Sequence, residues 1–538
     1  MDVNDVLLLA SAVVLGLVWW RRCSKTGGVD GLPPGPPGWP VVGNLFQVIL
    51  QRRPFMYVVR DLREKYGPIF TMRMGQRTLV IVTDADLIHD ALVKQGPMFA
   101  SRPADSPIRL LFSVGKCTVN SAPYGPLWRA LRRNFVAEIV SPQRVKGFSW
   151  IREWAMGNHL RRIRAEHAKT GAVRMMASCR LTICSILICI CFGAKIPDEL
   201  IVEIEEVLKD VMMISLPKLP DFLPLLTPLF RRELAEAKNL RRRQLNCLLP
   251  LVRARREFLR TGGNACKAAG EGNRVIGGVE MMSPPGEAYV DSLFDLEPPG
   301  RGKRLGEEEL VTLCSEVMSA GTDTSATALE WVMMHLILDP AAQERVYDEV
   351  VAKAGKTARI TEADVEALPY LQAVVKETFR RHPPSHFVLS HAATRDAELG
   401  GYRVPADASV EFYTAWVTEN PETWPDPDAW RPERFLEGGE GHDTDITGTR
   451  ALRMMPFGAG RRICPAATLG VLHIQLTLAN MIRELRWTPP AGEGPPDPTE
   501  TFAFTVVMKN SLRAGIVERN QPPPVACSIP FFSSFFFS

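Results

Sequence analysis

The sequence lacks any long run of one charge sign. Its 538 residues include 64 basic and 60 acidic side chains, and the formal net charge is only +4. Proteins that bind nucleic acid usually gather basic residues into a patch or tail that contacts phosphates. The charge balance therefore gives no indication of nucleic acid as a partner.

The sequence also lacks a Cys-x-x-Cys pair, the spacing typical of structural zinc sites. Its 11 cysteines are scattered along a long chain, which favours reduced thiols facing the cytosol over a disulfide framework. Cys184, Cys189 and Cys191 are close enough in sequence to suggest metal ligands. Because the surrounding run LTICSILICICFG is uniformly apolar, a buried core helix is the better interpretation.

No proline-rich linker interrupts residues 41–519, where amphipathic helical stretches dominate. With 46% hydrophobic residues, the chain has enough apolar material for a large core. These features predict one large domain that is mostly α with a minor β sheet. Short β-type runs are predicted at residues 78–83, 402–413 and 504–509, and a mobile surface loop at residues 261–286.

An apolar run at residues 6–20 is followed at once by basic residues. This arrangement predicts a single membrane anchor over residues 1–25. A cleaved signal peptide is the alternative. Asp2 and Asp5 count against it, because they stand where such peptides carry basic residues.

A proline-rich hinge is predicted over residues 26–40, which include LPPGPPGWP. Proline removes backbone donors and favours a stiff, extended chain that can hold a globular body off the membrane. Residues 520–538 form a low-complexity tail, first rich in proline and then in phenylalanine and serine, with no functional interpretation.

The strongest chemical signal is the segment PFGAGRRICPA at residues 456–466. Gly458 and Gly460 allow a tight turn beneath a flat ligand. Pro465 fits the first turn of a helix, whose positive end would stabilise a thiolate at Cys464. For the cysteine alone, an inert buried thiol is the better interpretation, but the full string favours a metal ligand.

This segment resembles the haem-binding signature of the cytochrome P450 family, with Phe457, Gly460, Arg462 and Cys464 in register. The resemblance implies a mostly helical P450 fold in which haem b lies between a long central helix and the cysteine loop. Its iron would be bound by the Cys464 thiolate, which favours cleavage of the O–O bond. Ala466 departs from the pattern, since the family usually has glycine there.

A second motif, AGTDTS at residues 320–325, lies in a helical stretch predicted from residue 307 to residue 339. Taken alone, small polar residues in a helix are more often ordinary packing. The resemblance implies that this segment crosses the distal face of the haem. Thr324 would hold bound dioxygen, Asp323 would connect to a proton supply, and Gly321 would permit close approach to the oxygen.

The haem propionates need cationic or hydrogen-bonding partners. The resemblance assigns this role to Arg102 in ASRP, Trp128 and Arg132 in WRALR, His391 in SHAAT, and Arg462. Two alternatives stay open. Arg132 is also consistent with a solvated helix charge, and His391 with a loop histidine whose hydrogen bonds are satisfied.

Glu377 and Arg380 in KETFR are three residues apart and share one face of a helix. A pair of this kind is usually a surface salt bridge. The resemblance implies instead that Arg434, in the segment PERF, joins them in a buried ionic network that positions the cysteine loop.

The resemblance extends from residue 33 to residue 519 and implies a monooxygenase that inserts one atom of O2 into a lipophilic small molecule. Because the chain has no nicotinamide or flavin fingerprint, its electrons would come from NADPH through NADPH–cytochrome P450 reductase. Arg129 and Arg133 are candidates for a positive face that binds this partner. The implied location is the endoplasmic reticulum membrane, with the catalytic domain in the cytosol.

Longer segments are similar to a plant group associated with in-chain hydroxylation and epoxidation of cutin-pathway fatty acids, namely TDTSATALEW, KETFRRHPP, GYRVPADASVEFYTA and DITGTRALRMMPFGAGRRICP. A free fatty acid needs a partner for its carboxylate, and Arg109 or His386 is the candidate. By resemblance, the cavity is lined by residues 109–112, Met318, Ala320, Phe387, Val388, Leu389, Val506 and Val507.

Three other functions stay open. They are oxidation of another plant lipophilic metabolite, a reductase-independent haem-thiolate isomerase or dehydratase, and a non-catalytic haem-binding sensor. Asp323 and Thr324 count against the isomerase, because that chemistry delivers no proton to dioxygen.

Overall fold

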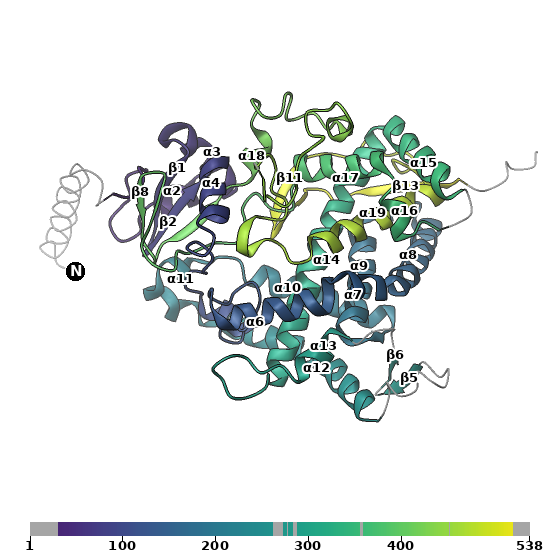
Figure 1. Ribbon diagram of the computed structural model, residues 1–538, viewed down its shortest axis with the longest axis horizontal. Coiled ribbons are helices and arrows are strands. Elements are labelled where there is room, and N and C mark those ends of the chain that lie inside the picture. The colour runs from purple at the N-terminus through teal and green to yellow at the C-terminus, as the bar shows by residue number, and fades with distance from the viewer. Residues whose placement is uncertain are drawn as a thin grey trace, which may run out of the picture.

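The computed structural model describes residues 31–261, 273–276, 278–282, 288–355, 359–450 and 452–519. The predicted anchor at residues 1–25 and the predicted tail at residues 520–538 lie outside the described residues. Figure 1 shows a mostly helical molecule with a small sheet region toward the N-terminal end.

The first half of the described chain is mainly helical. Its helices are α2 (Leu45–Leu50), α3 (Phe55–Tyr66), α4 (Ala85–His89), η1 (Asp90–Lys94), α5 (Pro107–Phe112), α6 (Pro126–Phe135), η2 (Val136–Val140), α7 (Pro142–Gly147), α8 (Ser149–Thr170), α9 (Met175–Phe192), α10 (Asp198–Ile214), α11 (Leu219–Phe222), η3 (Pro224–Phe230) and α12 (Arg231–Arg260).

The second half contains the longest helix of the described chain and the segments that surround the cysteine loop. Its helices are α13 (Tyr289–Phe294), α14 (Glu307–Leu338), α15 (Pro340–Ala354), α16 (Glu362–Val365), α17 (Pro369–Arg381), α18 (Ala415–Glu419), η5 (Pro432–Phe435), η6 (Gly460–Arg462) and α19 (Ala467–Glu484).

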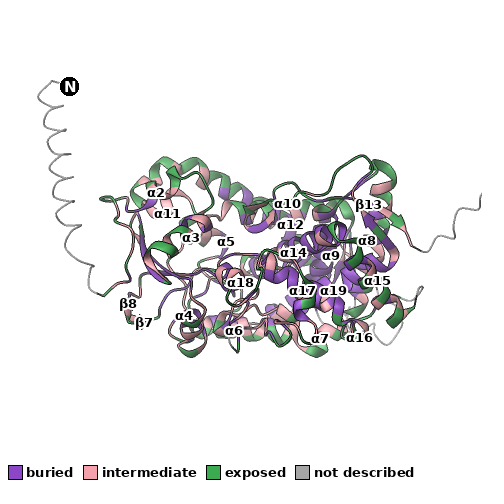
Figure 2. Ribbon diagram, turned by 90° about the horizontal axis from the view of Figure 1, so that it is seen from above, coloured by how far each residue is buried: buried purple, intermediate pink, exposed green. Residues whose placement is uncertain are grey.

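Helix α14 matches the helical stretch predicted at residues 307–339. It is buried along most of its length, and Figure 2 shows it among buried segments of α9 and α19. The helix ends at Leu338 because Pro340 cannot continue it. Asp339 instead caps the next helix, accepting a hydrogen bond from the amide of Ala342 at 3.0 Å.

Helix α9 forms the centre of the core together with α14. Of the helices that the structure describes, α9 alone is long and apolar enough to cross a membrane, but 78% of its residues are buried inside the protein. It carries Cys184, Cys189 and Cys191, all buried. The prediction of a buried core helix is confirmed.

The described strands form small sheets. They are β1 (Ile69–Met74), β2 (Arg77–Val82), β3 (Val173–Arg174), β4 (Ala194–Lys195), β5 (Asn273–Ile276), β6 (Val279–Met282), β7 (Ala397–Leu399), β8 (Tyr402–Val404), β9 (Ser409–Phe412), β10 (Leu485–Thr488), β11 (Glu500–Ala503), β12 (Thr505–Met508) and β13 (Arg513–Glu518). Sheet order is β1-β2-β9, β10-β13-β3, β11-β12, β4-β6-β5 and β7-β8.

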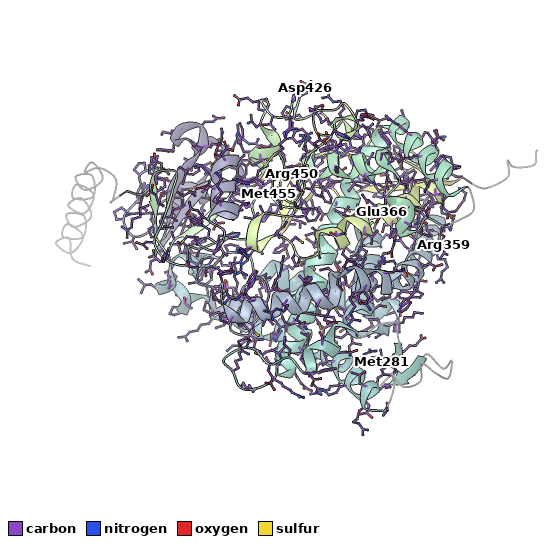
Figure 3. The ribbon with its side chains drawn as sticks, viewed as in Figure 1. Met281, Arg359, Glu366, Asp426, Arg450 and Met455 are labelled. Carbon is purple, nitrogen blue, oxygen red and sulfur yellow. The ribbon has the colours of Figure 1, made fainter. Side chains whose placement is uncertain are left out.

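The predicted β-type runs are confirmed as β2, β8, β9 and β12. Residues 402–413 split between two sheets, because β8 pairs with β7 whereas β9 lies parallel to β2. The prediction of a mobile loop at residues 261–286 is wrong in part. Strands β5 and β6 form a hairpin that adds to β4, and Met281, labelled in Figure 3, is fully buried.

The described part of the hinge, residues 31–40, is extended and lies against the body of the protein. The amide of Thr71 donates to the Pro34 carbonyl at 2.8 Å, and the amide of Arg403 donates to the Gly31 carbonyl at 2.7 Å. At Gly35 an added Cβ would lie 1.9 Å from the carbonyl oxygen of Thr71. This contact fixes the start of the described chain to the sheet region.

Candidate active site

The cysteine loop at residues 456–466 is a tight connection into α19. The amide of Cys464 donates to the Phe457 carbonyl at 2.8 Å and folds the loop back on itself. Gly460 has a φ of +68°, and an added Cβ there would lie 1.8 Å from the carbonyl oxygen of Leu92. The loop therefore requires glycine at this position, because it packs directly against η1.

Cys464 is half-buried. Burial raises the pKa of its thiol, whereas a hydrogen bond from the backbone amide of Ala466 and the charge of Arg132 act in the opposite direction. Ala466 has a φ of −104°, so the backbone at this position does not need glycine. The donor to the sulfur is a backbone group, and alanine supplies it as well as glycine does.

Three guanidinium groups gather beside this loop. Arg132 donates to the Ile463 carbonyl at 2.7 Å, and Arg462 lies over the ring of Trp128 at 4.6 Å from its centroid. Burial, followed by the charges of Arg102 and Arg132, lowers the pKa of Arg462 to about 9. Burial also lowers the pKa of Arg102 to about 10. The three guanidinium groups therefore form a positively charged cluster that is largely removed from water.

These arginines donate to backbone carbonyls rather than to acids. Among the described residues, no carboxylate lies within 4.0 Å of Arg102, Arg132 or Arg462. His391 lies 3.4 Å from Arg102, and its buried Nε2 atom has no hydrogen-bond partner in the described structure. A buried positive cluster with an unused polar atom, next to an accessible thiol, fits a ligand with acidic groups and a metal. The two propionates of haem match this requirement.

Thr324 lies on an accessible face of α14. Its hydroxyl donates to the Ala320 carbonyl at 2.7 Å, the i−4 bond expected of a mid-helix threonine. Ala320 is exposed although the flanking turns of the helix are buried. An added Cβ at Gly321 would lie 2.8 Å from Leu187 of α9, so this glycine permits close packing of α14 on α9. The role of Gly321 in the approach of oxygen stays a prediction.

Asp323 faces the core, where two side chains bind its carboxylate. Its carboxylate pairs with Arg180 of α9 and accepts a hydrogen bond from the hydroxyl of Thr505 at 2.8 Å. Arg180 also pairs with Glu205 of α10. Arg180 was not predicted from the sequence, although it is the only charged residue within α9. A single buried arginine in an apolar helix needs a carboxylate partner, so the sequence did contain a signal for Arg180.

Glu316 was also missed. It lies on α14, where it accepts hydrogen bonds from the amides of Val119 at 2.9 Å and Asn120 at 2.6 Å. Burial raises its pKa to about 7 despite these bonds and the nearby Arg462. Glu316 holds the loop whose Val119 carbonyl accepts hydrogen bonds from both Trp128 and Arg462.

The predicted network around Glu377 is confirmed. Arg380 pairs with Glu377 at 2.7 Å, and Arg434 approaches it to 3.4 Å, with all three side chains at most 1% exposed. The same helix contacts the cysteine loop, because the ring of Phe379 packs edge-on against that of Phe457 at 5.2 Å. The network is therefore linked to the loop through α17.

The residues expected to line a cavity divide into two groups. Ala320 and Leu389 are exposed, and Val388 and Val507 are half-buried. Met318 and Val506 belong to the core instead, and Phe387 stacks on Phe55 at 5.8 Å. The accessible members nearest the cysteine loop include Val388, 3.6 Å from an added Cβ on Gly458.

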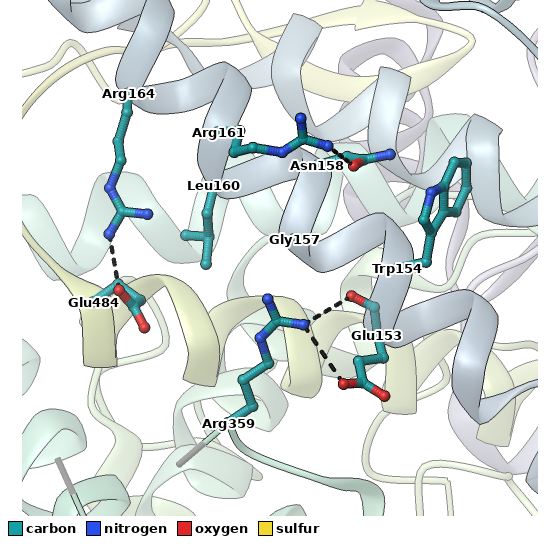
Figure 4. A pocket seen from close by; sticks show the side chains of 9 residues that line it. All are labelled: Glu153, Trp154, Gly157, Asn158, Leu160, Arg161, Arg164, Arg359 and Glu484. Carbon is teal, nitrogen blue, oxygen red and sulfur yellow. Dashed lines mark hydrogen bonds and ion pairs between the residues drawn. The ribbon is translucent and has the colours of Figure 1, made fainter. Parts of the chain in front are cut away.

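A pocket of about 430 Å³ lies elsewhere, between α8 and the end of α19 (Figure 4). Its arginines are engaged, Arg164 with Glu484 at 2.8 Å and Arg359 with Glu153 at 3.6 Å. Glu484 ends α19, so the pocket lies roughly 26 Å along the helix from its cysteine end. It is separate from the candidate site.

Comparison with known proteins agrees with this geometry. The cytochrome P450 family model matches residues 33–514. The chain is 35% identical to cytochrome P450 89A9 of Arabidopsis thaliana, covering 95% of this chain and 98% of that protein. It is 30% identical to tryptamine 5-hydroxylase (94% of each chain) and to flavonoid 3'-monooxygenase CYP75B3 (95% of this chain, 97% of that one), both of Oryza sativa subsp. japonica.

A solved zebra fish cytochrome P450 structure with abiraterone has a TM-score of 0.68 at 21% identity and covers 87% of this chain and 100% of that one. It shows the fold. With the family model spanning most of its length, this chain belongs to the cytochrome P450 family and is an oxidoreductase of the monooxygenase type.

Proposed function

We propose that this chain is a membrane-associated haem-thiolate monooxygenase whose iron is bound by Cys464 and whose haem propionates are held by Arg102, Trp128, Arg132, His391 and Arg462. The observation that carries the proposal is the desolvated arginine cluster beside the Cys464 thiol, without a carboxylate partner among the described residues. Phe457 and Gly460 shape the loop that presents the sulfur.

Bound haem supplies reductive activation of O2 beside the substrate. The chain's own residues do the rest. The amide of Ala466 and the charge of Arg132 favour the thiolate form of Cys464. Thr324 presents a hydroxyl on the accessible face of α14, where it orients the protons needed to release one oxygen atom as water. Asp323, one residue earlier, connects that hydroxyl to a proton supply.

The electrons come from NADPH through a separate reductase in this proposal. Arg129 and Arg133 support it, because they are exposed and one turn apart on α6. The helix that bears them also carries Arg132, which reaches the cysteine loop. An acidic partner bound there would lie close to the proximal side of the site.

Membrane association is supported by an apolar patch on the described surface, in addition to the anchor predicted at residues 1–25. The patch consists of exposed side chains from residues 39–50 and from η3, namely Trp39, Val41, Phe46, Ile49, Leu50, Leu225 and Leu229. Asn44 bonds to Arg73, and Phe222, two residues before η3 begins, bonds to Gln76, so both segments start beside the β1–β2 turn. Figure 2 shows α2 and α11 together at the end where the described chain begins.

The substrate is proposed to be a lipophilic small molecule. A cutin-pathway fatty acid is the narrower proposal, and it rests on sequence resemblance. The candidate carboxylate anchors give it little support. Arg109 lies 4.0 Å from Asp105 and donates to the Ser215 carbonyl at 2.9 Å. Burial lowers the pKa of His386 to about 4, so it is uncharged at neutral pH.

The test is product formation in reductase-bearing microsomes that contain this chain, supplied with NADPH and with panels of fatty acids, flavonoids, aromatic amines and terpenoids. NADPH-dependent and reductase-dependent oxygenated products, measured by mass spectrometry, are expected. Products formed without reductase would support the isomerase or dehydratase instead. Haem binding with no turnover of any panel member would support a sensor.

A further inference from the structure

We propose that Arg180 and Thr505 are positioning residues that hold the Asp323 carboxylate for proton delivery. This inference rests on the role proposed for Asp323 above. It adds two residues from distant parts of the chain, α9 and β12, which the sequence motifs do not identify.

The carboxylate is held from two sides. Arg180 pairs with Oδ1, and the Thr505 hydroxyl donates to Oδ2 at 2.8 Å. Asp323 is 3% exposed and Thr505 is 2% exposed, so neither bond is replaced by bulk water without a rearrangement. Hydrogen bonds to a buried carboxylate are strong, and together they fix its orientation. The carboxylate faces the core, whereas Thr324 lies on the accessible face of the helix.

Arg180 is shared between two acids. Its Nη1 atom pairs with Asp323, and its Nε atom pairs with Glu205 of α10, whose side chain is 14% exposed. A single guanidinium thus neutralises one carboxylate in the core and another near the surface. Any weakening of the Glu205 pair leaves Arg180 to Asp323 alone, so Glu205 sets how tightly the buried acid is held.

Thr505 places the second contact on the β11–β12 hairpin. The turn residue Phe504 has a φ of +70°, the left-handed region that non-glycine residues rarely adopt. The Trp331 indole donates to the Val506 carbonyl at 2.9 Å, which fixes the hairpin to α14. Glu500 on β11 lies 2.7 Å from His382. These contacts fix the hairpin to its surroundings, and the hydroxyl of Thr327 on α14 lies 3.1 Å from that of Thr505.

The same hairpin carries Val507, which resemblance assigns to the lining of the substrate cavity. Val507 follows Thr505 by two residues, so their side chains lie on one face of β12, and Val507 is half-buried.

The first test is Thr505→Val, which removes the hydroxyl and keeps the shape of the side chain. The expected result is a roughly tenfold fall in product formed per NADPH consumed, a changed solvent deuterium isotope effect on product formation, and an unchanged carbon monoxide spectrum. Thr505→Ser restores the hydroxyl and should recover most of the coupling. In a crystal structure of Thr505→Val, the Asp323 carboxylate should have turned.

Ser511→Ala is the matched control. Ser511 donates to Glu330, another buried carboxylate of α14, at 2.6 Å. Its loss removes the same kind of bond without touching Asp323, so coupling should be unchanged. An equal fall in Ser511→Ala and Thr505→Val, or no fall in Thr505→Val, would overturn the positioning role of Thr505.

Arg180→Lys and Glu205→Gln test the ion pair on the Arg180 side of the Asp323 carboxylate. Lysine keeps the charge but cannot bridge two carboxylates, so coupling and the isotope effect should change in Arg180→Lys. Glu205→Gln should change the isotope effect in the same assay. Asp323→Asn distinguishes the role of Asp323 from the role of the residues that hold it. If Asp323→Asn leaves product formed per NADPH unchanged, Asp323 does not deliver protons. If Asp323→Asn lowers product formed per NADPH but the Thr505 and Arg180 variants do not, Thr505 and Arg180 are not positioning residues.

Discussion

At the scale of single residues, the backbone supplies much of the chemistry around Cys464. The family signature usually has glycine where this chain has Ala466, yet the donor to the sulfur is the amide of that residue. Its φ of −104° is open to any residue. Gly460 is different, because its positive φ and the nearby Leu92 carbonyl exclude a side chain. In this loop, position 460 therefore requires glycine for steric reasons, whereas position 466 tolerates alanine.

The ligand assignment predicts a spectroscopic loss. Cys464→Ala should abolish the red-shifted Soret band that a thiolate-bound haem shows when reduced with carbon monoxide, because no other sulfur lies in the loop. Cys247→Ala is the control, since Cys247 is a buried thiol on α12 that carries no assigned role. A Cys464→Ala protein that kept the band would show that the ligand is another residue.

The Thr324 hydroxyl predicts a change in coupling rather than in binding. Thr324→Ala should keep haem and substrate affinity but divert electrons into peroxide, because the hydroxyl manages protons and holds no cofactor. Coupling should fall more than NADPH consumption, measured as product and peroxide formed per NADPH. Thr322→Ala, at a buried position on the same helix, should leave coupling near the level of the unaltered protein. Unchanged coupling in Thr324→Ala would remove this residue from the mechanism.

Residue-level prediction from sequence succeeded where a motif fixes both partners. The motifs KETFR and PERF contain Glu377, Arg380 and Arg434, and the structure brings these residues together. Arg180 and Thr505 lie in no motif, and their meeting with Asp323 depends on packing between distant segments. The packing of Gly321 against Leu187 was not predicted, because the pattern gives its position in the helix but not the direction in which its missing Cβ points.

At the scale of elements, local signals fixed the helices better than the sheets. The prediction for α14 was within one residue of its end, because Pro340 stops the helix. Strand positions were also recognisable from β-type runs. Strand partners were not recognisable, since β2 and β9 are paired across more than 300 residues and the local sequence of neither strand specifies its partner. The β5–β6 hairpin was missed because glycine-rich flanks concealed its alternating buried residues, Val279 and Met281.

The α17–η5 junction predicts a stability cost that an exposed pair does not have. Glu377→Gln leaves Arg380 and Arg434 buried with no full counter-charge, and the free energy of unfolding should fall by about 3–5 kcal/mol. Haem content should fall with it, because α17 packs against the cysteine loop. Chemical denaturation and the carbon monoxide spectrum measure the two effects.

Glu433→Gln is the matched control on the same segment. Glu433 pairs with Arg345 at 2.8 Å, but their side chains are 48% and 51% exposed. Solvent screening limits such a pair to at most about 1 kcal/mol. Equal losses in the two variants would mean that burial of the Glu377 network does not set its contribution.

At the scale of the whole molecule, the candidate site depends on segments from most of the chain. Widely separated segments meet at the cysteine loop: Arg132 bonds to Ile463, Arg102 lies near Arg462 of the loop, and His391 contacts Arg102. The order of motifs indicated this assembly only through resemblance to a family, because no local pattern states which loops meet. The apolar patch was not predicted at all. It appears only when residues 39–50 and η3 are brought to the same edge of the β1–β2 sheet.

The position of this patch predicts membrane binding independent of the anchor. A chain that starts at residue 31 should still bind vesicles of neutral and anionic phospholipid, because exposed apolar side chains at one end of a protein enter the interface. Replacing Leu50, Leu225 and Leu229 with serine removes its three most exposed leucines. If each contributes about 1 kcal/mol on partial burial, affinity should fall roughly a hundredfold.

Vesicle sedimentation measures this affinity, and the carbon monoxide spectrum checks that the variant is folded. Val517→Ser with Leu338→Ser is the control, since these residues are 57% and 43% exposed but lie outside the patch. The control should bind as the parent does. Equal loss in both variants would indicate general surface hydrophobicity, and no loss in either would show that the shortened chain binds through another surface. Failure of the shortened parent chain to bind would leave membrane attachment to residues 1–30. Loss confined to the patch would orient the sheet end toward the bilayer, so that a lipophilic substrate dissolved in the membrane is presented to that end of the protein.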